Sequence, residues 1–325
     1  MHVTGVPLPT RDDVLAARET IAGRVHRTPT FSSATLGERI GAHAFLKAEL
    51  FQKTGSFKPR GVLNKLASLS PEEKGRGVVT WSAGNHAQAV AWAASRQGID
   101  CLVVMSAGAS AQKVAATRGY GAVVDLEAPD PTAAHERLLR LIDETGRTYI
   151  PPFDDPLVIA GQGTVGLEIA EDVPDADVIV CPIGGGGLIS GIATAVPGCR
   201  IVGVEPEKSA AFTAGLAAGH SVHIDLQPTI ADGLAPPFAG ELTLAVGRER
   251  VEEVVLVTED EIAAGMRFLY ARAKLACEPS GAAATAALLA GKIAFEPGST
   301  VVAVVSGGNA AAKVASAILG EADES

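Results

Sequence analysis

Apolar residues along this chain fall into two kinds of run that alternate over most of its length. Short continuous runs rich in β-branched residues predict buried parallel strands, because helices cover both faces of such strands. Longer stretches, in which apolar residues recur every three or four positions, predict helices between them. Alternating strands and helices indicate an α/β fold with mainly parallel sheets covered on both faces.

The first block of alternation runs from about Gly77 to Ile150. Strands are predicted at 78–80, 101–105, 122–124 and 148–150, and helices at 85–97, 110–119 and 131–145. Four strands would make a small, complete lobe. Upstream, Thr10 is expected to cap a helix through about Val25, and residues 43–47 are expected to form a strand.

The segment P-P-F-D-D-P at 151–156 interrupts the pattern and predicts a crossing between two lobes. We expect a small lobe of residues 77–151 and a large lobe of residues 1–76 with 152–325, each with three αβα layers and with a cleft between them. The second block is expected to contain helices at 155–173, 187–196, 259–276 and 281–291, strands at 177–182, 200–205 and 301–305, a loop-rich stretch around 220–240 and a frayed end at 321–325.

Composition excludes several classes of protein. With 47% hydrophobic and 20% charged residues, the 325-residue chain is globular rather than disordered. A formal net charge of −10 without a basic block argues against nucleic-acid and anionic-membrane partners. No signal region or apolar run of about 18 residues is present, and the cysteines form no C-x-x-C pair. We therefore expect a cytoplasmic protein with free thiols and no zinc site.

Candidate chemistry begins at Lys58, in the stretch F-L-K-A-E-L-F-Q-K-T-G-S-F-K-P-R-G at 45–61. Turn and cap residue types at 54–56 precede it, and Pro59 suits the first turn of a helix. Lys58 is thus predicted at a helix N-terminus, where the helix dipole destabilises its ammonium form. Such an amine can attack a carbonyl such as the aldehyde of pyridoxal phosphate (PLP), whereas an arbitrary lysine is usually a solvated surface residue.

Three glycine-containing motifs each follow a predicted strand. W-S-A-G-N-H-A-Q at 81–88 would present backbone N–H groups to a carboxylate, although it also fits an ordinary capped turn. I-G-G-G-G-L at 183–188 suits a phosphate; a dinucleotide remains an alternative because Glu205 ends the next strand, but Ile189 breaks the fingerprint. V-S-G-G-N at 305–309 supplies Ser306 as a hydroxyl and is by itself a weak turn signal.

Together these motifs match the requirements of a PLP enzyme acting on an amino acid. S-F-K-P-R-G, S-A-G-N-H-A-Q, V-I-A-G-Q-G-T (158–164), G-G-G-G-L, T-I-A-D-G (229–233), C-E-P-S-G (277–281) and S-G-G-N occur in that order. Over residues 10–320 the chain resembles the fold-type II PLP enzymes, which share a tryptophan synthase β-like fold, and specifically the threonine/serine dehydratase and serine racemase branch. No match extends to the regulatory domain that longer dehydratases carry.

The resemblance implies a role for each motif. Lys58 would hold the cofactor covalently and act as the base at the substrate Cα. The residues implied to contact the cofactor are Phe57 beside the ring, Asn85 at the ring hydroxyl, Gly184, Gly185, Gly186, Gly187 and Leu188 at the phosphate, Ser306 at the pyridine nitrogen, and Gly233 and Glu278 around the ring. The residues implied to bracket the substrate carboxylate are Ser82, Ala83, Asn85 and His86.

Two departures from the racemase pattern matter. Racemases have a serine at the position of Ala83 that moves a proton on the second face of the substrate, and alanine cannot do this. Their divalent-cation site would correspond to Glu205, Ser209 and Ala211, where the second carboxylate is missing. We therefore expect no tight Mg²⁺ or Ca²⁺ site, while weak or monovalent binding stays open.

The leading hypothesis is an ammonia-lyase that converts L-threonine or L-serine to a 2-oxo acid and ammonia, with PLP as cofactor. The alternatives are a serine racemase-like isomerase and a dehydratase of 3-hydroxyaspartate or phenylserine. A nicotinamide-dependent oxidoreductase and a non-catalytic binding protein are weaker. The resemblance implies a homodimer or homotetramer.

Overall fold

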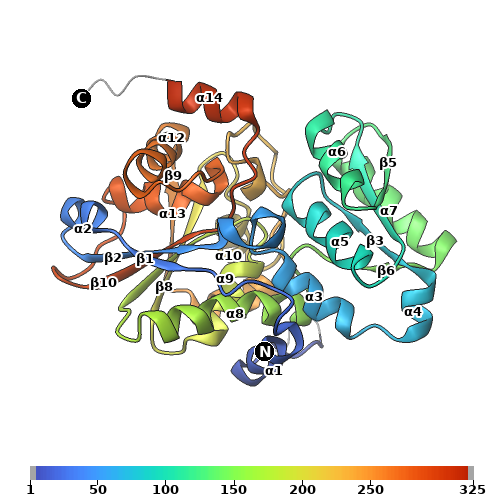
Figure 1. Cartoon of the computed structure of the whole chain (residues 1–325), viewed down its shortest axis with the longest axis horizontal. Helices are drawn as coiled ribbons and strands as arrows, with labels where there is room; N and C mark the ends of the chain where they lie inside the picture. The colour runs from blue at the N-terminus through green and yellow to red at the C-terminus, as the bar shows by residue number, and fades with distance from the viewer. Residues whose placement is uncertain (1–4, 321–325) are drawn as a thin grey trace.

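The computed structural model describes residues 5–320, which contain two β-sheets with helices on both faces of each (Figure 1). All neighbouring strands are parallel except one pair, β1 and β2. The predicted α/β class with mainly parallel sheets is therefore confirmed. Within the described residues, no helix has the length and hydrophobicity needed to cross a membrane.

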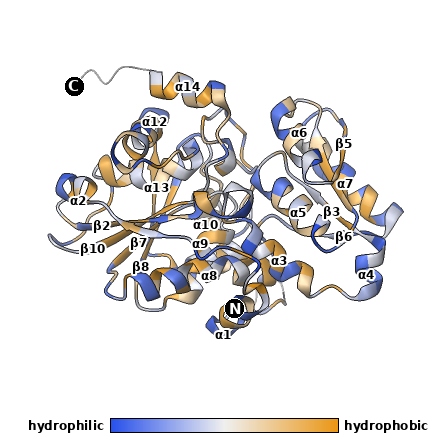
Figure 2. Ribbon diagram, in the orientation of Figure 1, coloured by the Kyte–Doolittle hydropathy of each residue, from blue (hydrophilic) through white to orange (hydrophobic). Residues whose placement is uncertain are grey.

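The larger sheet has six strands in the order β1-β2-β10-β7-β8-β9. Its central strands are hydrophobic along their length, as Figure 2 shows, because parallel strands are covered on both faces. Their bounds are β1 Thr30–Ser32, β2 His43–Ala48, β10 Thr300–Val305, β7 Val178–Pro182, β8 Arg200–Pro206 and β9 Glu253–Val257.

Alternate residues of each strand in the larger sheet belong to two hydrophobic clusters, one on each face of the sheet. In β7, Val178 and Val180 belong to one apolar cluster, and Ile179 and Cys181 belong to the other, as the two-residue repeat of a strand requires. The first cluster is completed by α2 (Ala34–Ile40), α12 (Glu259–Phe268), α13 (Pro279–Leu289) and α14 (Ala312–Gly320). The second is completed by α1 (Arg11–Ile21), α8 (Pro156–Asp172), α9 (Gly187–Ala195), α10 (Ala211–Ala218) and α11 (Glu241–Arg250).

The smaller sheet has four strands in the order β5-β4-β3-β6. Its strands are β5 Val123–Ala128, β4 Cys101–Ser106, β3 Val78–Trp81 and β6 Thr148–Tyr149. One face packs against α5 (Asn85–Ser95) and α6 (Ala111–Gly119), and the other packs against α7 (Pro131–Thr145). Helix α3 (Pro59–Ala67) contacts both α5 and α8, so it joins the two parts of the molecule.

The remaining elements are short. Helix α4 covers Pro71–Arg76, 3₁₀ turns lie at Glu49–Phe51, Lys53–Gly55 and Asp232–Leu234, and a π-helical turn lies at Leu269–Ala273.

Several predicted boundaries need correction. Thr10 does cap the first helix, in a capping box with Asp13, but α1 ends at Ile21 instead of near Val25. Gly23 follows with a φ of 69°, a left-handed conformation that a glycine adopts without strain. The helix expected over 259–276 ends at Phe268 and continues only as the π-helical turn. The predicted frayed end at 321–325 lies outside the described residues.

Candidate active site

A cavity of about 360 Å³ lies where the carboxyl ends of β3 and β7 meet the start of α3. Residues from both sheets line it, as expected for a ligand site in an open α/β fold. All site residues predicted from the sequence line this cavity. They are Phe57, Lys58, Ser82, Ala83, Asn85, His86, Gly184, Gly185, Gly186, Gly187, Leu188, Gly233, Glu278 and Ser306.

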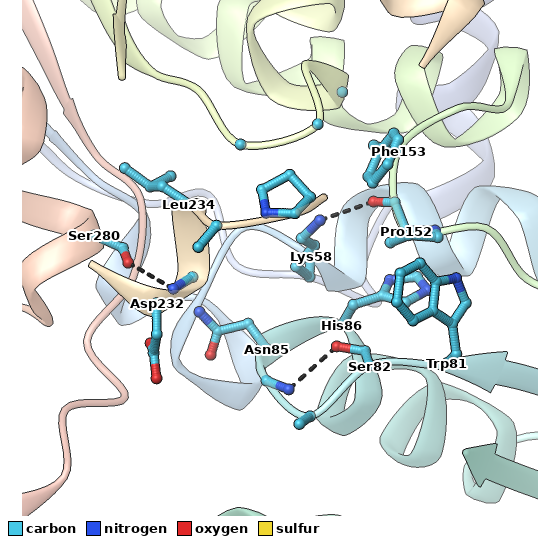
Figure 3. A pocket seen from close by; sticks show the side chains of 18 of the residues that line it. Lys58, Trp81, Ser82, Asn85, His86, Pro152, Phe153, Asp232, Leu234 and Ser280 are labelled. Atoms are coloured by element: carbon cyan, nitrogen blue, oxygen red, sulfur yellow. Dashed lines mark hydrogen bonds between the residues drawn. The ribbon is translucent and has the colours of Figure 1, made fainter. Parts of the chain in front are cut away.

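Lys58 occupies the N-cap position of α3, with Pro59 as the first helical residue. Its Nζ donates a hydrogen bond of 2.8 Å to the backbone oxygen of Pro152 and lies 5.0 Å from the centre of the Phe57 ring (Figure 3). Burial lowers the pKa of Lys58 to about 8. The neutral, nucleophilic amine is therefore far more populated near neutral pH than in an exposed lysine.

The loop before Lys58 is joined to the loop after β10. Ser56 forms a β-bridge with Gly307, and Phe57 donates its N–H to the backbone oxygen of Ser306 over 3.2 Å. Asn309 donates to the backbone oxygen of Thr54, whose φ is 62°. Residues 54–56, which are of turn and cap residue types, thus form a turn that connects two sides of the cavity, and Lys58 itself takes the N-cap position of α3.

Arg60, two residues after Lys58, anchors the helix start to α8 and to the 3₁₀ turn that follows β2. The guanidinium is 1% exposed and forms two hydrogen bonds to each of two carboxylates. It donates to Glu49 over 2.8 and 2.9 Å and to Glu168 over 2.7 and 2.9 Å. Lys47, also fully buried, adds a 2.7 Å ion pair to Glu168. This set of four charged residues was not predicted, because its members lie on separate segments of the chain.

The turn between β3 and α5 contains Ser82, Ala83 and Gly84. Ser82 Oγ accepts a hydrogen bond of 3.1 Å from the Gly84 N–H, which shapes the turn (Figure 3). Helix α5 then begins at Asn85. The N–H groups of its first turn have no carbonyl partners within the helix, and together with the helix dipole they favour a bound carboxylate.

The His86 side chain offers a ligand a hydrogen-bond acceptor and no free donor. Its Nε2 lies 3.0 Å from the backbone oxygen of Ile150, so Nε2 carries the ring hydrogen in the neutral ring and Nδ1 carries a lone pair. Burial, helped by the nearby charge of Lys58, lowers the pKa of His86 to about 3. A carboxylate at this turn would thus be held by backbone N–H groups rather than by the imidazole.

Asn85 has a fixed amide orientation at the centre of the cavity. Its Nδ2 donates to Glu278 Oε1 over 2.6 Å, and its Oδ1 accepts from Asn309 Nδ2 over 2.8 Å. One hydrogen of Nδ2 remains for a ligand. Burial raises the pKa of Glu278 to about 7, and the hydrogen bond from Asn85 opposes this shift.

The turn from Gly184 to Gly187 leads from β7 into α9. Gly186 has a φ of 94°, and a Cβ on it would lie 2.6 Å from the Phe212 ring. A Cβ on Gly185 would lie 2.2 Å from the Phe153 ring. Only glycine fits at positions 185 and 186, and the backbone N–H groups of this turn at a helix N-terminus suit a phosphate.

Two further residues, Ser306 and Gly233, also line the cavity. Ser306 is 4% exposed and presents a hydroxyl that can donate or accept. Gly233 donates its N–H to Ser280 Oγ over 3.0 Å (Figure 3).

Several lining residues were not predicted as site residues. Trp81 and Phe153 form an apolar side of the cavity, and Lys113 pairs with Asp232 across its mouth. Trp81 is the first residue of the motif at 81–88 and Phe153 lies in the segment at 151–156, but neither position carries a local signal that its side chain faces a ligand.

Glu205 does not face the cavity. It is 0% exposed and accepts hydrogen bonds from the backbone N–H groups of Phe212 and Thr213 and from the Thr213 hydroxyl. It therefore caps α10 and cannot bind a nucleotide ribose. No cluster of His, Cys, Asp or Glu suited to a metal ion occurs within residues 5–320.

The residues present fit PLP. A half-buried amine, the N–H groups of a glycine turn at a helix N-terminus, an amide and a hydroxyl all line one cavity, and these are the groups that an aldehyde, a phosphate and a polar ring require. This combination defines an enzyme that uses a phosphorylated aldehyde cofactor. The chain belongs to the family described as "Pyridoxal-phosphate dependent enzyme", whose model matches residues 21–307.

Known relatives match over nearly the whole chain. An L-threonine ammonia-lyase of Thermotoga maritima is 45% identical over 92% of this chain and 75% of its own length. The catabolic L-threonine dehydratase TdcB of Escherichia coli K12 is 44% identical over 95% of both chains. The solved structure of maize serine racemase is 39% identical, with a TM-score of 0.90 over 94% of this chain and 95% of the other. The oxidoreductase interpretation of the glycine turn is thereby excluded.

Proposed function

We propose that this protein is a PLP-dependent ammonia-lyase that acts on a β-hydroxy L-amino acid, L-threonine or L-serine, and forms a 2-oxo acid and ammonia. The observation that carries the proposal is the buried Lys58 amine, placed between the glycine turn and the N-terminus of α5. The two curated relatives named for threonine elimination support it.

PLP, when bound, supplies the electron sink for the charge that develops at the substrate Cα. Lys58 would hold the cofactor covalently, and its neutral amine, once free, would take the Cα proton of the substrate. The N–H groups at the start of α5 would orient the substrate carboxylate, and Asn85 and the glycine turn would hold the cofactor. Water leaves from Cβ and another water later releases ammonia, so the net products are the 2-oxo acid and ammonia.

Ser306 lines the cavity, and we expect it to face the ring nitrogen and to favour elimination. A hydroxyl does not force that nitrogen to stay protonated as a carboxylate would, so the electron sink is milder. Rapid loss of the β-hydroxyl suits such a sink better than a long-lived carbanion does.

A racemase is the second candidate, because maize serine racemase shares the fold so closely. The methyl group of Ala83 lines the cavity and cannot transfer a proton to the second face of the substrate. Chiral analysis of serine after incubation separates the two activities. Formation of D-serine at a rate comparable to pyruvate would overturn our assignment.

We also propose a division of labour between the lobes. Residues 1–76 with 152–325 would bind PLP, and residues 77–151 would bind the substrate carboxylate. The buried thiols of Cys101, Cys181 and Cys277 support a reducing, cytoplasmic setting. A homodimer or homotetramer without a tight divalent cation is expected, which light scattering and activity in the presence of EDTA would test.

Replacing Lys58 by alanine tests the proposed function directly. The Lys58→Ala variant should lose at least about a thousandfold in turnover, because it lacks both the covalent anchor and the base. The measurement is a coupled assay for 2-oxo acid with L-threonine and L-serine. Lys313→Ala removes an exposed lysine on α14 and should match wild type. Equal turnover in the Lys58 variant and wild type would reject the role of Lys58.

A further inference from the structure

The cavity has one apolar side, to which the proposed mechanism assigns no role. Trp81 and Phe153 lie on the same side of Lys58, and Asp232 and Ser280 lie on the other (Figure 3). Trp81 is the residue before Ser82, so its indole adjoins the carboxylate turn. The Phe153 ring packs on Gly185, so it adjoins the phosphate turn. These two rings therefore border the space between the substrate carboxylate and the phosphate.

The rings are held in place by a larger aromatic cluster. Phe238 stacks on Trp81, with ring centres 6.4 Å apart, and packs edge-on to Phe153 at 5.8 Å. The indole N–H of Trp81 donates to the Tyr149 hydroxyl over 3.1 Å. The polar atom of Trp81 is thereby already satisfied, and what Trp81 offers a ligand is apolar surface.

The charged side chains of the cavity leave no free cation for a second carboxylate. Lys58 is committed to the reaction, and Lys113 is paired with Asp232. His86 is neutral, and its free nitrogen is an acceptor. Among the described residues, no arginine lines the cavity, and Glu278 adds a further carboxyl group. A carboxylate on the β-carbon of a substrate would be buried without a partner, at a high energetic cost.

We infer that Trp81 and Phe153, backed by Phe238, form the subsite for the β-substituent of the substrate and select an apolar group there. This inference rests on the proposed function and extends it to substrate choice. L-Threonine should be preferred over L-serine, because its β-methyl packs on the rings. L-threo-3-Hydroxyaspartate should be the poorest of the three, because its second carboxylate meets no cation.

The experiment compares kcat/KM for these three amino acids in the PLP-loaded enzyme. One methyl group in an apolar pocket is worth about tenfold or more, so L-threonine should exceed L-serine by about that factor. Trp81→Ala should bring the threonine-to-serine ratio to within about threefold of one, since it removes the surface that contacts the methyl group. Phe238→Ala, which leaves the cavity lining in place but removes its support, should reduce the ratio by a smaller factor.

The matched control is Trp92→Ala, which removes an indole on α5 that faces Lys53 instead of the cavity. It should leave the substrate ratio unchanged. The inference is overturned if wild type prefers 3-hydroxyaspartate, or if both the Trp81 and Phe238 variants keep the wild-type ratio while loaded with PLP. Absence of 2-oxo acid from every substrate with loaded wild type would instead refute the proposed function, so the two failures are distinct.

Discussion

The turns after β3 and β7 both present backbone N–H groups to a ligand in the cavity, but the protein packs around them differently. Both connect a parallel strand to a helix, and both line the cavity. The turn after β7 consists of glycines, and the rings of Phe153 and Phe212 occupy the positions that side chains at 185 and 186 would take. The turn after β3 has serine, alanine and a glycine, Gly84, around which a Cβ would meet no atom within 4 Å.

The difference indicates how each turn treats its ligand. The glycine turn is shaped by the protein that packs behind it, so its geometry is fixed before the phosphate arrives. The turn after β3 has open space on its cavity side and depends on N–H groups at the start of α5. A resident cofactor suits the first arrangement, and a substrate that must enter and leave suits the second.

The largest expected effect comes from adding a methyl group to the packed turn. Gly185→Ala would place a Cβ 2.2 Å from the Phe153 ring, which must then shift. Overpacking of this kind costs about 1–3 kcal/mol, which corresponds to as much as a hundredfold weaker PLP binding. Equilibrium dialysis with absorbance of the bound cofactor measures it. Unchanged PLP affinity would mean that the turn is not preformed.

The same substitution at the open turn should act on the substrate instead. Gly84 has a negative φ of −130° and open space at its Cβ position. Gly84→Ala should keep PLP affinity and stability within about 0.5 kcal/mol, while KM rises roughly threefold to tenfold. Titration of PLP and steady-state kinetics on one preparation check both. A loss of PLP affinity as large as that of Gly185→Ala would show that the two turns do not differ in this way.

The smallest effect concerns the lysine between the turns. Burial lowers the pKa of Lys58 to about 8, so the neutral amine that attacks the aldehyde increases as pH rises through 8 and levels off above it. The rate of PLP uptake by apoenzyme should rise with a midpoint near pH 8. Stopped-flow absorbance between pH 6.5 and 9.5 measures it. A rate still rising steeply at pH 10, as for an exposed lysine, would contradict the burial seen here.

Local sequence was enough to predict those parts of the fold that local patterns specify. The runs at 78–80, 101–105 and 301–305 are rich in β-branched residues and almost entirely apolar, and they form β3, β4 and β10. Strand β9, E-V-V-L-V, was not predicted, because it lies at a half-exposed edge and lacks the flanking turn signals. Helices α10 and α11 were also missed: each is interrupted by glycine and owes its stability to packing.

The site residues also fall into two groups, those that local motifs predicted and those that only tertiary packing brings together. Lys58, the glycine turn and the start of α5 were found because each motif follows a strand end, where α/β proteins bind ligands. The contacts of Trp81 with Phe238 and of Arg60 with Glu168 join residues 157 and 108 positions apart. Such pairings depend on tertiary packing and leave no periodicity or spacing to detect in one sequence.

Arg60 carries a permanent charge only two residues from the reactive amine, yet burial alone accounts for the shift in the Lys58 pKa. Arg60 and Lys47 carry two positive charges, and Glu49 and Glu168 carry two negative charges, so this buried set of four residues sums to zero. The charges that anchor the helix are therefore not a cause of the lowered pKa of Lys58. Evolution could therefore retune the basicity of Lys58 through the polarity of the cavity without rebuilding the support beneath it.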